Sequence, residues 1–156
     1  MRTPFVNTAM LIRRPVDEVF QAFTEPGVTS WFWFTHGDRR LTAGAQATWT
    51  WGMYGVSTRV AVKAIEPSRR ILIDWNLEDR PTEVEFLFES RGKATWVEII
   101  NRGFEDSDEG LAEAFDAKEG FALVLAGAKL WLEQAIEPRF ILDRFPDRVR
   151  ETWKQR

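Results

Sequence analysis

The sequence has no cysteine, one histidine and one tyrosine among its 156 residues. Without cysteine the chain can form no disulfide, no thiolate nucleophile and no zinc–sulfur site. A single histidine cannot supply a metal site that needs two histidine ligands. We therefore expect no metal and no cofactor, and the lack of thiols agrees with a reducing, cytoplasmic location.

Clusters of like charge and long apolar runs are also missing. The net charge is −3, from 21 basic and 24 acidic residues, and no run of lysine or arginine exceeds two residues. Nucleic-acid binding needs concentrated positive charge, so we expect no nucleic-acid partner. No apolar run reaches the roughly 18 residues of a membrane-spanning helix, and the N-terminal MRTPFVNTAM lacks the apolar centre of a signal peptide. We therefore expect no membrane partner.

Motifs of common enzyme classes are absent as well. The chain has neither a Gly-x-Ser-x-Gly nucleophile turn nor a glycine-rich phosphate loop. Histidine is a common general base, but His36 lies in the polar loop 35–38, where a solvated histidine is the favoured interpretation. Tyr54 could give a ligand a hydrogen bond or simply occupy a hairpin tip. Asp74 and Glu98 alternate with apolar neighbours and should face solvent rather than form an acid–base pair. The sequence leaves enzymatic activity undecided.

Large aromatic residues are what the chain has in surplus, with eight tryptophans and twelve phenylalanines. Each such ring can bury about 150–250 Å², so the surplus suits either a thick core or the wall of an apolar cavity. Four of these rings are consecutive at positions 31–34, at the end of a helical turn predicted over 28–32. A membrane-dipping tip is disfavoured there because Arg39 and Arg40 are the only basic residues nearby.

Hydrophobic periodicity predicts that the chain begins with a strand and a short helix. Residues 5–13 fit a strand, and Pro15 then opens a stretch in which Val16, Val19 and Phe20 recur at helical spacing. The Glu-Pro-Gly sequence that follows ends this helix before the second helical turn.

From residue 44 the apolar period changes to two, which predicts five more strands joined by tight turns. Val84, Phe86 and Phe88 share one face of their strand and glutamates share the other, as in a sheet that water wets on one side. Only the helical stripe of residues 110–136 is long enough to cover the dry face. The five strands are expected at residues 44–52, 57–65, 70–77, 82–90 and 93–101.

Residues 138–156 form a tail beyond the domain predicted over 1–137. We expect a loop followed by a short helix that begins at Pro146, with Val149 and Trp153 four residues apart. The tail contains large apolar side chains that are costly to leave in water. We therefore expect it to dock on the domain or on a second subunit.

The order of the predicted elements resembles the helix-grip fold of START-like, or SRPBCC, proteins, and three stretches are similar to the family named after the activator of Hsp90 ATPase. Residues 13–32 resemble the opening of that family, residues 64–75 its proline turn between strands, and residues 93–104 its last strand ending in Gly-Phe. Gly120-Phe121 stands where the family often has Gly-Trp. The opening match consists of Arg14, Pro15, Val19, Phe20, Thr24, Pro26 and Trp31.

The resemblance implies an α+β, helix-grip fold: a curved antiparallel sheet of six strands wrapped on a long C-terminal helix, with two small helices after the first strand. It implies a cavity between sheet and helix that binds a small apolar or aromatic ligand, with weak cyclase or hydrolase activity as an extension. The alternative is a protein-interaction module with a closed core, like the co-chaperone domain that gave the family its name. The expected partner is a small hydrophobic molecule, with a homodimer or another protein as further partners.

In a helix-grip fold, Trp31 and Phe32 should plug the core while Trp33 or Phe34 lines the cavity entrance. Asn101 shares the strand phase of the inner-face residues and could orient a ligand, or could instead satisfy backbone groups at a strand end. The predicted ligand-binding residues are Trp33, Phe34, Trp49, Trp51, Trp75, Phe86, Phe88, Asn101, Phe121 and Leu125.

Small residues on the long helix have two interpretations. Ala122, Ala126, Gly127 and Ala128 could leave room for a ligand opposite the tryptophans, or could let helix and sheet pack tightly. A large cavity would not stay empty, because a dry void of about 300 Å³ costs roughly 7 kcal/mol, which is similar to the whole stability of a domain.

Overall fold

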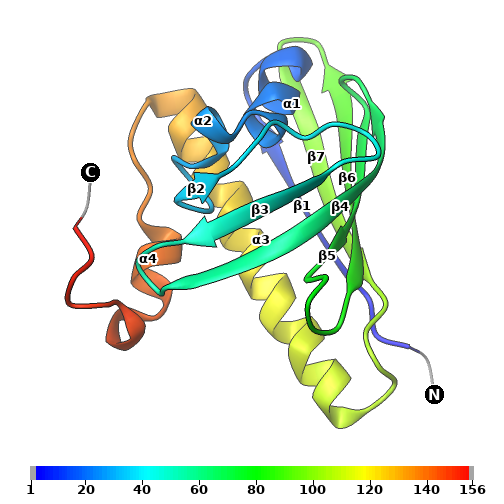
Figure 1. The fold of residues 1–156 in the computed structure, drawn as a ribbon. Coiled ribbons are helices and arrows are strands. Elements are labelled where there is room, and N and C mark those ends of the chain that lie inside the picture. Colours follow the sequence, from blue (N-terminus) through cyan, green and yellow to red (C-terminus); the bar gives the residue numbers. More distant parts are fainter. Residues whose placement is uncertain (1–2, 155–156) are drawn as a thin grey trace.

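The fold places one long helix across a curled antiparallel sheet, as a computed structural model shows for residues 3–154 (Figure 1). This arrangement confirms the predicted α+β, helix-grip class. Residues 1–2 and 155–156, the outer ends of the two predicted segments, lie outside the described residues. The elements are β1 (Val6–Ile12), α1 (Val16–Thr24), α2 (Pro26–Thr29), β2 (His36–Gly37), β3 (Gln46–Trp51), β4 (Val56–Glu66), β5 (Arg70–Trp75), β6 (Thr82–Arg91), β7 (Ala94–Arg102), α3 (Asp108–Gln134), α4 (Phe140–Arg144) and the 3₁₀ turn η1 (Pro146–Arg148).

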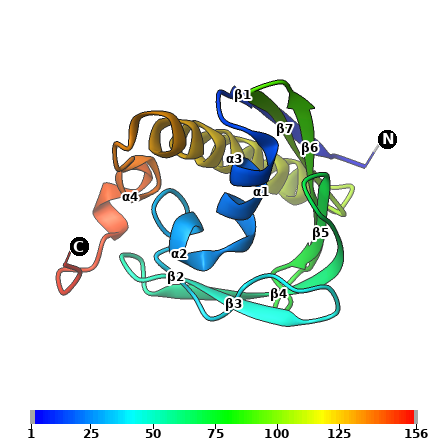
Figure 2. The same cartoon turned by 90° about the horizontal axis from the view of Figure 1, so that it is seen from above.

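Seven strands of the described chain form one sheet in the order β1-β7-β6-β5-β4-β3-β2, and neighbouring strands are antiparallel. Six of them are the predicted strands. The seventh, β2, is a two-residue edge strand in which His36 pairs with Thr50 and Gly37 with Trp49. Two residues are too few to show a hydrophobic period. Seen from above, the sheet curls around α1 and α2, and α3 crosses the open side of the curl (Figure 2).

Helix α1 packs inside the closed end of the curled sheet. It begins directly after Pro15, whose φ of −60° suits a helix start. Proline has no backbone N–H, but at a helix start that N–H would have no partner within the helix. Its apolar stripe buries Phe20 and Phe23, and the Phe20 ring meets the Phe88 ring edge-on with centroids 5.2 Å apart. The helix ends at Thr24, and the capping residue Glu25 is extended because a proline follows it.

Helix α3 covers the dry face of the sheet and is capped at both ends. The Ser107 Oγ accepts a hydrogen bond from the Gly110 backbone N–H at 3.0 Å, and Asp108 and Glu109 place negative charge at the positive end of the helix dipole. At the other end Ala135 adopts the left-handed conformation, with φ of 52°. Both ends of α3 lie two residues before the predicted ones. Asp108 and Glu109 form the first turn, and the left-handed Ala135 ends the helix after Gln134.

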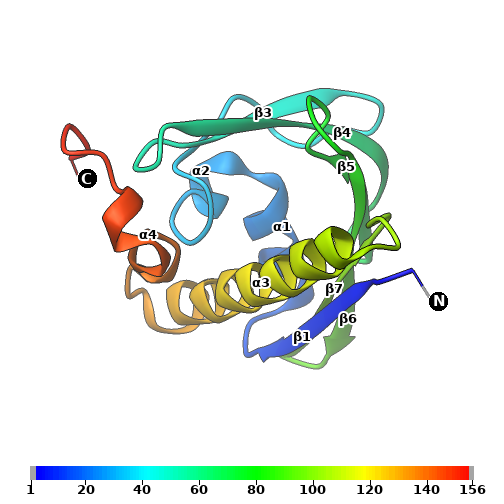
Figure 3. The same cartoon turned by 90° about the horizontal axis from the view of Figure 1, so that it is seen from below.

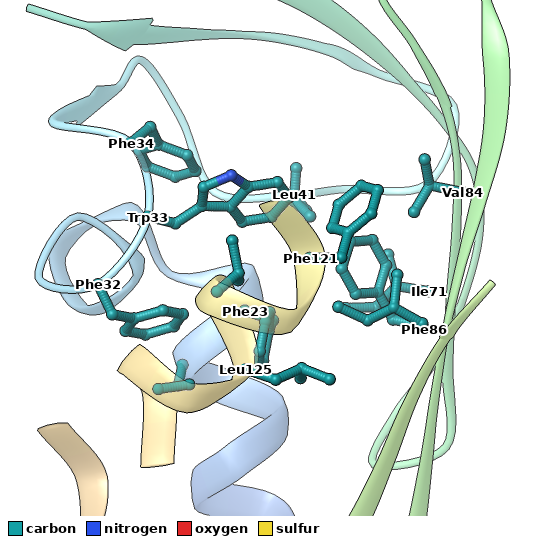
Figure 4. Packing of buried hydrophobic residues seen from close by; sticks show 14 of the residues in the cluster. Phe23, Phe32, Trp33, Phe34, Leu41, Ile71, Val84, Phe86, Phe121 and Leu125 are labelled. Atoms are coloured by element: carbon teal, nitrogen blue, oxygen red, sulfur yellow. The ribbon is translucent and has the colours of Figure 1, made fainter. Parts of the chain in front are cut away.

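The core fills the space between α1, α2 and the second half of α3, as Figure 4 shows for Phe23, Phe32 and Leu125. A Cβ atom added to Gly127 would lie 3.3 Å from the Phe32 Cβ, and Ala128 is fully buried. Gly127 and Ala128 therefore serve tight packing, whereas Ala122 is exposed. Neither Gly127 nor Ala128 leaves room for a ligand.

The outer face of the sheet carries a ladder of ion pairs centred on Glu85. This carboxylate is 9% exposed and accepts hydrogen bonds from Arg70 and, at 2.8 Å, from Arg102. Burial alone would raise the pKa of Glu85, but the hydrogen bonds from the two arginines outweigh burial and hold the pKa below its ordinary value. Glu83, hydrogen-bonded by Lys63 and Arg102, also has a lowered pKa.

Replacing Glu85 by glutamine is expected to lower the free energy of unfolding at pH 7 by about 1–2 kcal/mol, because charge-assisted hydrogen bonds are lost. A carboxylate with a depressed pKa stabilises the fold above its unfolded pKa, near the ordinary value of 4.5, and loses that effect as the pH falls through the folded pKa. Denaturant unfolding between pH 3 and 7 should therefore show a flatter profile for the variant. Glu89→Gln, at an exposed pair on the same strand, is the control. Equal profiles for wild type and Glu85→Gln would contradict this role.

The tail is more structured than the predicted loop and single helix. Residues Phe140–Arg144 form a helix, α4, that the sequence did not predict, and only a 3₁₀ turn follows at Pro146–Arg148. The backbone N–H of Arg150 donates to the Met53 carbonyl at 2.8 Å. The Trp153 ring lies so close to Gly52 that an added Cβ would be 2.7 Å from it. The tail thus runs beside the hairpin between β3 and β4.

Candidate functional site

A cavity of about 1020 Å³ lies between the inner face of the sheet, the first half of α3 and the tail. Helices α1 and α2 lie inside the curl, and their buried side chains fill that part of it (Figure 3). In that view β3 and β4 lie on one side, α3 on the other, and α4 lies against α3.

One wall of this cavity is aromatic. The Trp33 and Trp75 rings stack with centroids 5.7 Å apart and an interplanar angle of 7°. The Phe121 ring meets both edge-on, at 5.9 Å from Trp33 and 6.2 Å from Trp75, and Trp51 meets Trp75 at 5.8 Å. All four rings line the cavity. Their mutual contacts hold the rings in fixed positions, so they give the cavity a rigid apolar wall.

The ten residues predicted to bind a ligand divide into two groups. Five of them do not line the cavity and are buried in the core behind it: Phe34, Trp49, Phe86, Phe88 and Leu125. The five that line the cavity are Trp33, Trp51, Trp75, Asn101 and Phe121.

The aromatic run at 31–34 contributes to three different places. Trp31, expected to plug the core, is half-buried and stacks on Trp131 of α3 with centroids 4.4 Å apart. Phe32 is buried in the core as expected. Trp33 lines the cavity, whereas Phe34 lies behind it. The run therefore joins the core to the cavity wall. The expectation that Trp31 plugs the core was wrong, because this side chain stacks on Trp131 outside the core cluster.

A polar row crosses the inner face of the sheet at the cavity. It consists of Thr58 on β4, Asn76 after β5, Thr82 on β6 and Asn101 on β7, and all four side chains line the cavity. Asn101 is 2% exposed, and its Nδ2 donates to the Thr82 Oγ1 and to the Glu83 carbonyl, each at 2.9 Å. An otherwise apolar inner face thus ends in hydrogen-bonding groups.

Charged side chains surround the mouth of the cavity. Arg144 on α4 donates to the Asp116 carboxylate at 2.9 Å and to the Glu119 carboxylate at 3.1 Å, which ties α4 to α3. The Arg148 guanidinium lies over the Phe145 ring, 4.4 Å from its centroid. Cation–π contacts of this kind hold the ring in place at the mouth.

Tyr54 ties the tail to the sheet. Its hydroxyl donates to the carbonyls of Ile141 and Leu142, with 3.1 Å to the latter, and its ring lies 6.1 Å from that of Phe145. Burial raises the pKa of Tyr54, so the hydroxyl keeps its proton and remains a donor at neutral pH. Of the two interpretations from sequence, this geometry favours a structural tyrosine over a ligand donor.

The other titratable candidates lie away from the cavity. His36 is exposed on the edge strand β2. Asp74 pairs with Lys63 at 3.4 Å, and Glu98 accepts from Asn7 at 3.2 Å, both outside the cavity lining. Within residues 3–154 no group of three histidine, aspartate or glutamate side chains could hold a metal ion, and no helix is long and apolar enough to cross a membrane.

Sequence reasoning missed two parts of the cavity wall. Ala117 and Gly120 line it from the first half of α3, and Ile141 and Phe145 line it from the tail. Two small residues three positions apart on one helix were a usable signal for open space, since they share a face. No comparable signal existed for the tail, whose position depends on long-range contacts.

Residues 13–130 match the family described as Activator of Hsp90 ATPase homolog 1-like protein. No curated protein sequence matches the chain. Protein SSP2350 from Staphylococcus saprophyticus has a similar structure, with a TM-score of 0.77 and 23% identity over 87% of this chain and 96% of that one. DynU16, of the dynemicin biosynthetic locus, has a TM-score of 0.77 and 22% identity over 85% of this chain and 48% of its own. The Aha1 dimer from Colwellia psychrerythraea has a TM-score of 0.71 and 18% identity over 84% of this chain and 97% of its own.

Proposed function

The chain belongs to the family of Activator of Hsp90 ATPase homolog 1-like proteins, and on that premise we propose that it binds a small, flat, largely apolar molecule in the cavity between the sheet and α3. The aromatic wall carries the proposal. Trp33, Trp75 and Phe121 contact one another and line a space of about 1020 Å³, which suits a drug-sized ligand. Covering apolar surface with a ligand releases water and contributes about 25 cal/mol of favourable free energy per Å² of surface covered.

Binding fits the lining better than catalysis does. A general acid or base must reach the reacting atoms with a free proton or lone pair. The Tyr54 hydroxyl donates to carbonyls of the tail, the carboxylate of Asp116 is paired with Arg144, and that of Glu113 is paired with Arg80 at 3.4 Å. The cyclase or hydrolase activity suggested by the family resemblance would need an acid–base group that these contacts do not leave available.

The setting of one structural neighbour supports a small-molecule ligand. DynU16 belongs to the dynemicin biosynthetic locus, where a protein that holds a biosynthetic compound would have a use. The resemblance to DynU16 concerns the fold, so the support is for the type of ligand and not its identity.

A protein-interaction function is the second candidate, and exposed apolar side chains favour it. Phe115 on α3 and Phe5 before β1 are each 65% exposed, and Leu111 lies one turn before Phe115. Another member of the fold group, Aha1 from Colwellia psychrerythraea, forms a dimer. Sedimentation of the wild type against Phe115→Ser tests this function: association that the substitution weakens would support it.

The ligand-binding proposal is tested by filling the cavity. Ala117→Trp adds a large ring to the α3 wall, so we expect it to weaken binding of 2-methoxynaphthalene at least about tenfold by occupying the ligand's space. Shifts of the tryptophan indole N–H signals in ¹H–¹⁵N NMR spectra measure binding. Ala122→Trp, on the exposed face of the same helix, is the matched control and should bind like the wild type.

Two outcomes would contradict the proposal. Saturable binding that survives in Ala117→Trp would place the ligand elsewhere. Absence of saturable binding by the wild type, for this and other two-ring aromatic probes, would leave the cavity without the proposed function.

A further inference from the structure

We infer that the ligand carries a neutral hydroxyl group, which binds between Asn101 and Thr82 beside the ring of Trp75. This inference rests on the ligand-binding function proposed above and specifies the chemical class of the ligand as a hydroxylated aromatic compound. It follows from the hydrogen bonds that these two side chains make and from those that they leave unmade.

The amide of Asn101 is held in one orientation. Its donor atom bonds to the backbone carbonyl of Glu83 at 2.9 Å, and a carbonyl can only accept. That partner identifies the bonded atom as Nδ2, so the other amide atom is the oxygen. The second Nδ2 proton goes to the Thr82 Oγ1, also at 2.9 Å. Both amide protons are therefore used, and the amide cannot turn without breaking a buried hydrogen bond.

The Asn101 Oδ1 is an acceptor that the cavity can reach. No bond to this oxygen is formed within residues 3–154. Within the same residues, the Trp153 Nε1 is the one side-chain nitrogen or oxygen that is fully buried and has no hydrogen-bond partner. The Asn101 Oδ1 also has no partner, so it is not fully buried. Since Asn101 is 2% exposed and lines the cavity, the oxygen faces the ligand space. A buried amide oxygen left unpaired is costly, which favours a ligand that donates to it.

Thr82 supplies the complementary group. Its Oγ1 accepts the proton from Asn101, and its own hydroxyl proton has no acceptor in the described part of the chain. Thr82 also lines the cavity and is directly paired with Trp75 across β5 and β6. Side chains paired in this way have Cβ atoms about 4.5–5.5 Å apart. An acceptor and a donor thus lie side by side next to an aromatic face.

A hydroxyl group fits this pair better than other oxygen groups do. It donates to the Asn101 Oδ1 and accepts from the Thr82 hydroxyl, so both groups are satisfied. An ether or ketone only accepts and leaves Asn101 unpaired. A carboxylate brings a negative charge against the Asn101 oxygen, and no lysine or arginine within residues 3–154 is hydrogen-bonded to that side chain, so the charge is unfavourable in a buried site. A phenolic ring on the Trp75 face carries its hydroxyl at the required position.

Three probes of one shape test the inference: 2-naphthol, 2-methoxynaphthalene and 2-naphthoate. We expect 2-naphthol to bind the full chain about tenfold more tightly than the methyl ether, because the ether loses the donated hydrogen bond. The naphthoate should bind most weakly. Dissociation constants come from the indole N–H shifts, measured at pH 7, where naphthol is neutral.

Asn101→Leu should remove most of the preference for naphthol over the ether, because it removes the acceptor that only naphthol can use. Thr82→Val should instead weaken both probes by a similar factor, because the oxygen of each can accept from the Thr82 hydroxyl. Thr82→Val keeps the side-chain shape, so it provides the test even if Asn101→Leu fails to fold. Thr48→Val, on the outer face of β3, should leave the affinities of both probes unchanged and serves as the matched control.

The possible outcomes distinguish a failure of the hydroxyl site from a failure of the proposed ligand-binding function. Equal affinity for naphthol and its methyl ether in the wild type would overturn the hydroxyl site while leaving aromatic binding intact. Tightest binding of the naphthoate would also overturn it and would point to the arginines at the mouth. Unchanged affinity of both neutral probes in Thr82→Val, or a naphthol preference that persists in a folded Asn101→Leu, would contradict the assigned position. Absence of binding by all three probes would defeat the ligand-binding function itself.

Discussion

Replacing Trp33 by alanine is expected to lower the free energy of unfolding by about 3–5 kcal/mol, which is a large fraction of the stability of a domain of this size. Trp33 contacts rings from four elements, among them Trp49 on β3, Trp75 on β5 and Phe121 on α3. Removing it leaves a void next to the cavity that these rings cannot close without moving. Chemical denaturation monitored by circular dichroism measures the loss. The same variant should bind aromatic probes poorly, since half of the stacked pair is gone.

A matched substitution separates this effect from the general cost of losing a tryptophan. Trp96 is half-buried on the outer face of the sheet, where the Arg91 guanidinium lies 5.1 Å from its ring centroid. We expect Trp96→Ala to cost only about 1 kcal/mol and to leave probe binding unchanged. Equal losses of stability in the two variants would contradict the central place of Trp33 in the core and cavity wall.

Ending the chain after Glu137 is expected to have the second largest effect. We propose that residues 138–156 are a docked extension of the 1–137 domain and complete the cavity. Ile141, Leu142 and Trp153 are half-buried against the core, and losing their burial should cost about 3 kcal/mol, or about 10 °C in melting temperature for a chain of this size. Affinity for aromatic probes should fall at least about tenfold, because part of the wall is removed.

The single substitution Tyr54→Phe tests the same attachment without shortening the chain. It removes the hydroxyl that donates to the carbonyls of Ile141 and Leu142 and keeps the ring. We expect a loss of about 1 kcal/mol, and faster amide hydrogen exchange over 138–154 than in the wild type. A truncated chain with unchanged melting temperature, oligomeric state and probe affinity would show that the tail neither stabilises the domain nor completes the cavity.

The fold was largely predictable because its elements have clear apolar periods. The alternation of Val84, Phe86 and Phe88 with charged residues placed them on the buried face of β6, where all three are buried. The stripe on 110–136 identified the helix that covers them. The two residues of β2 and the five of α4 were not predicted, because such short segments show no apolar period.

The site was less predictable because strand phase gives the face of a residue and not what lies over it. Trp49 and Trp51 share a face of β3, but the Phe34 ring stacks on Trp49 with centroids 4.9 Å apart, and Trp51 is left to line the cavity. The position of Phe34 depends on how α1 and α2 enter the curl, which no local pattern encodes. Asn101 was predictable by phase alone, whereas its partner Thr82 required the register between β6 and β7.

The central claim, that an aromatic ligand binds in the cavity against Trp33 and Trp75, is tested most directly by intermolecular nuclear Overhauser effects between 2-naphthol and the protein. The structure predicts contacts from the naphthol ring protons to the side chains of Trp33, Trp75 and Phe121, and none to Trp96 on the outer face. Saturable binding whose contacts lie only outside the cavity lining, or on the exposed Phe5 and Phe115, would contradict it.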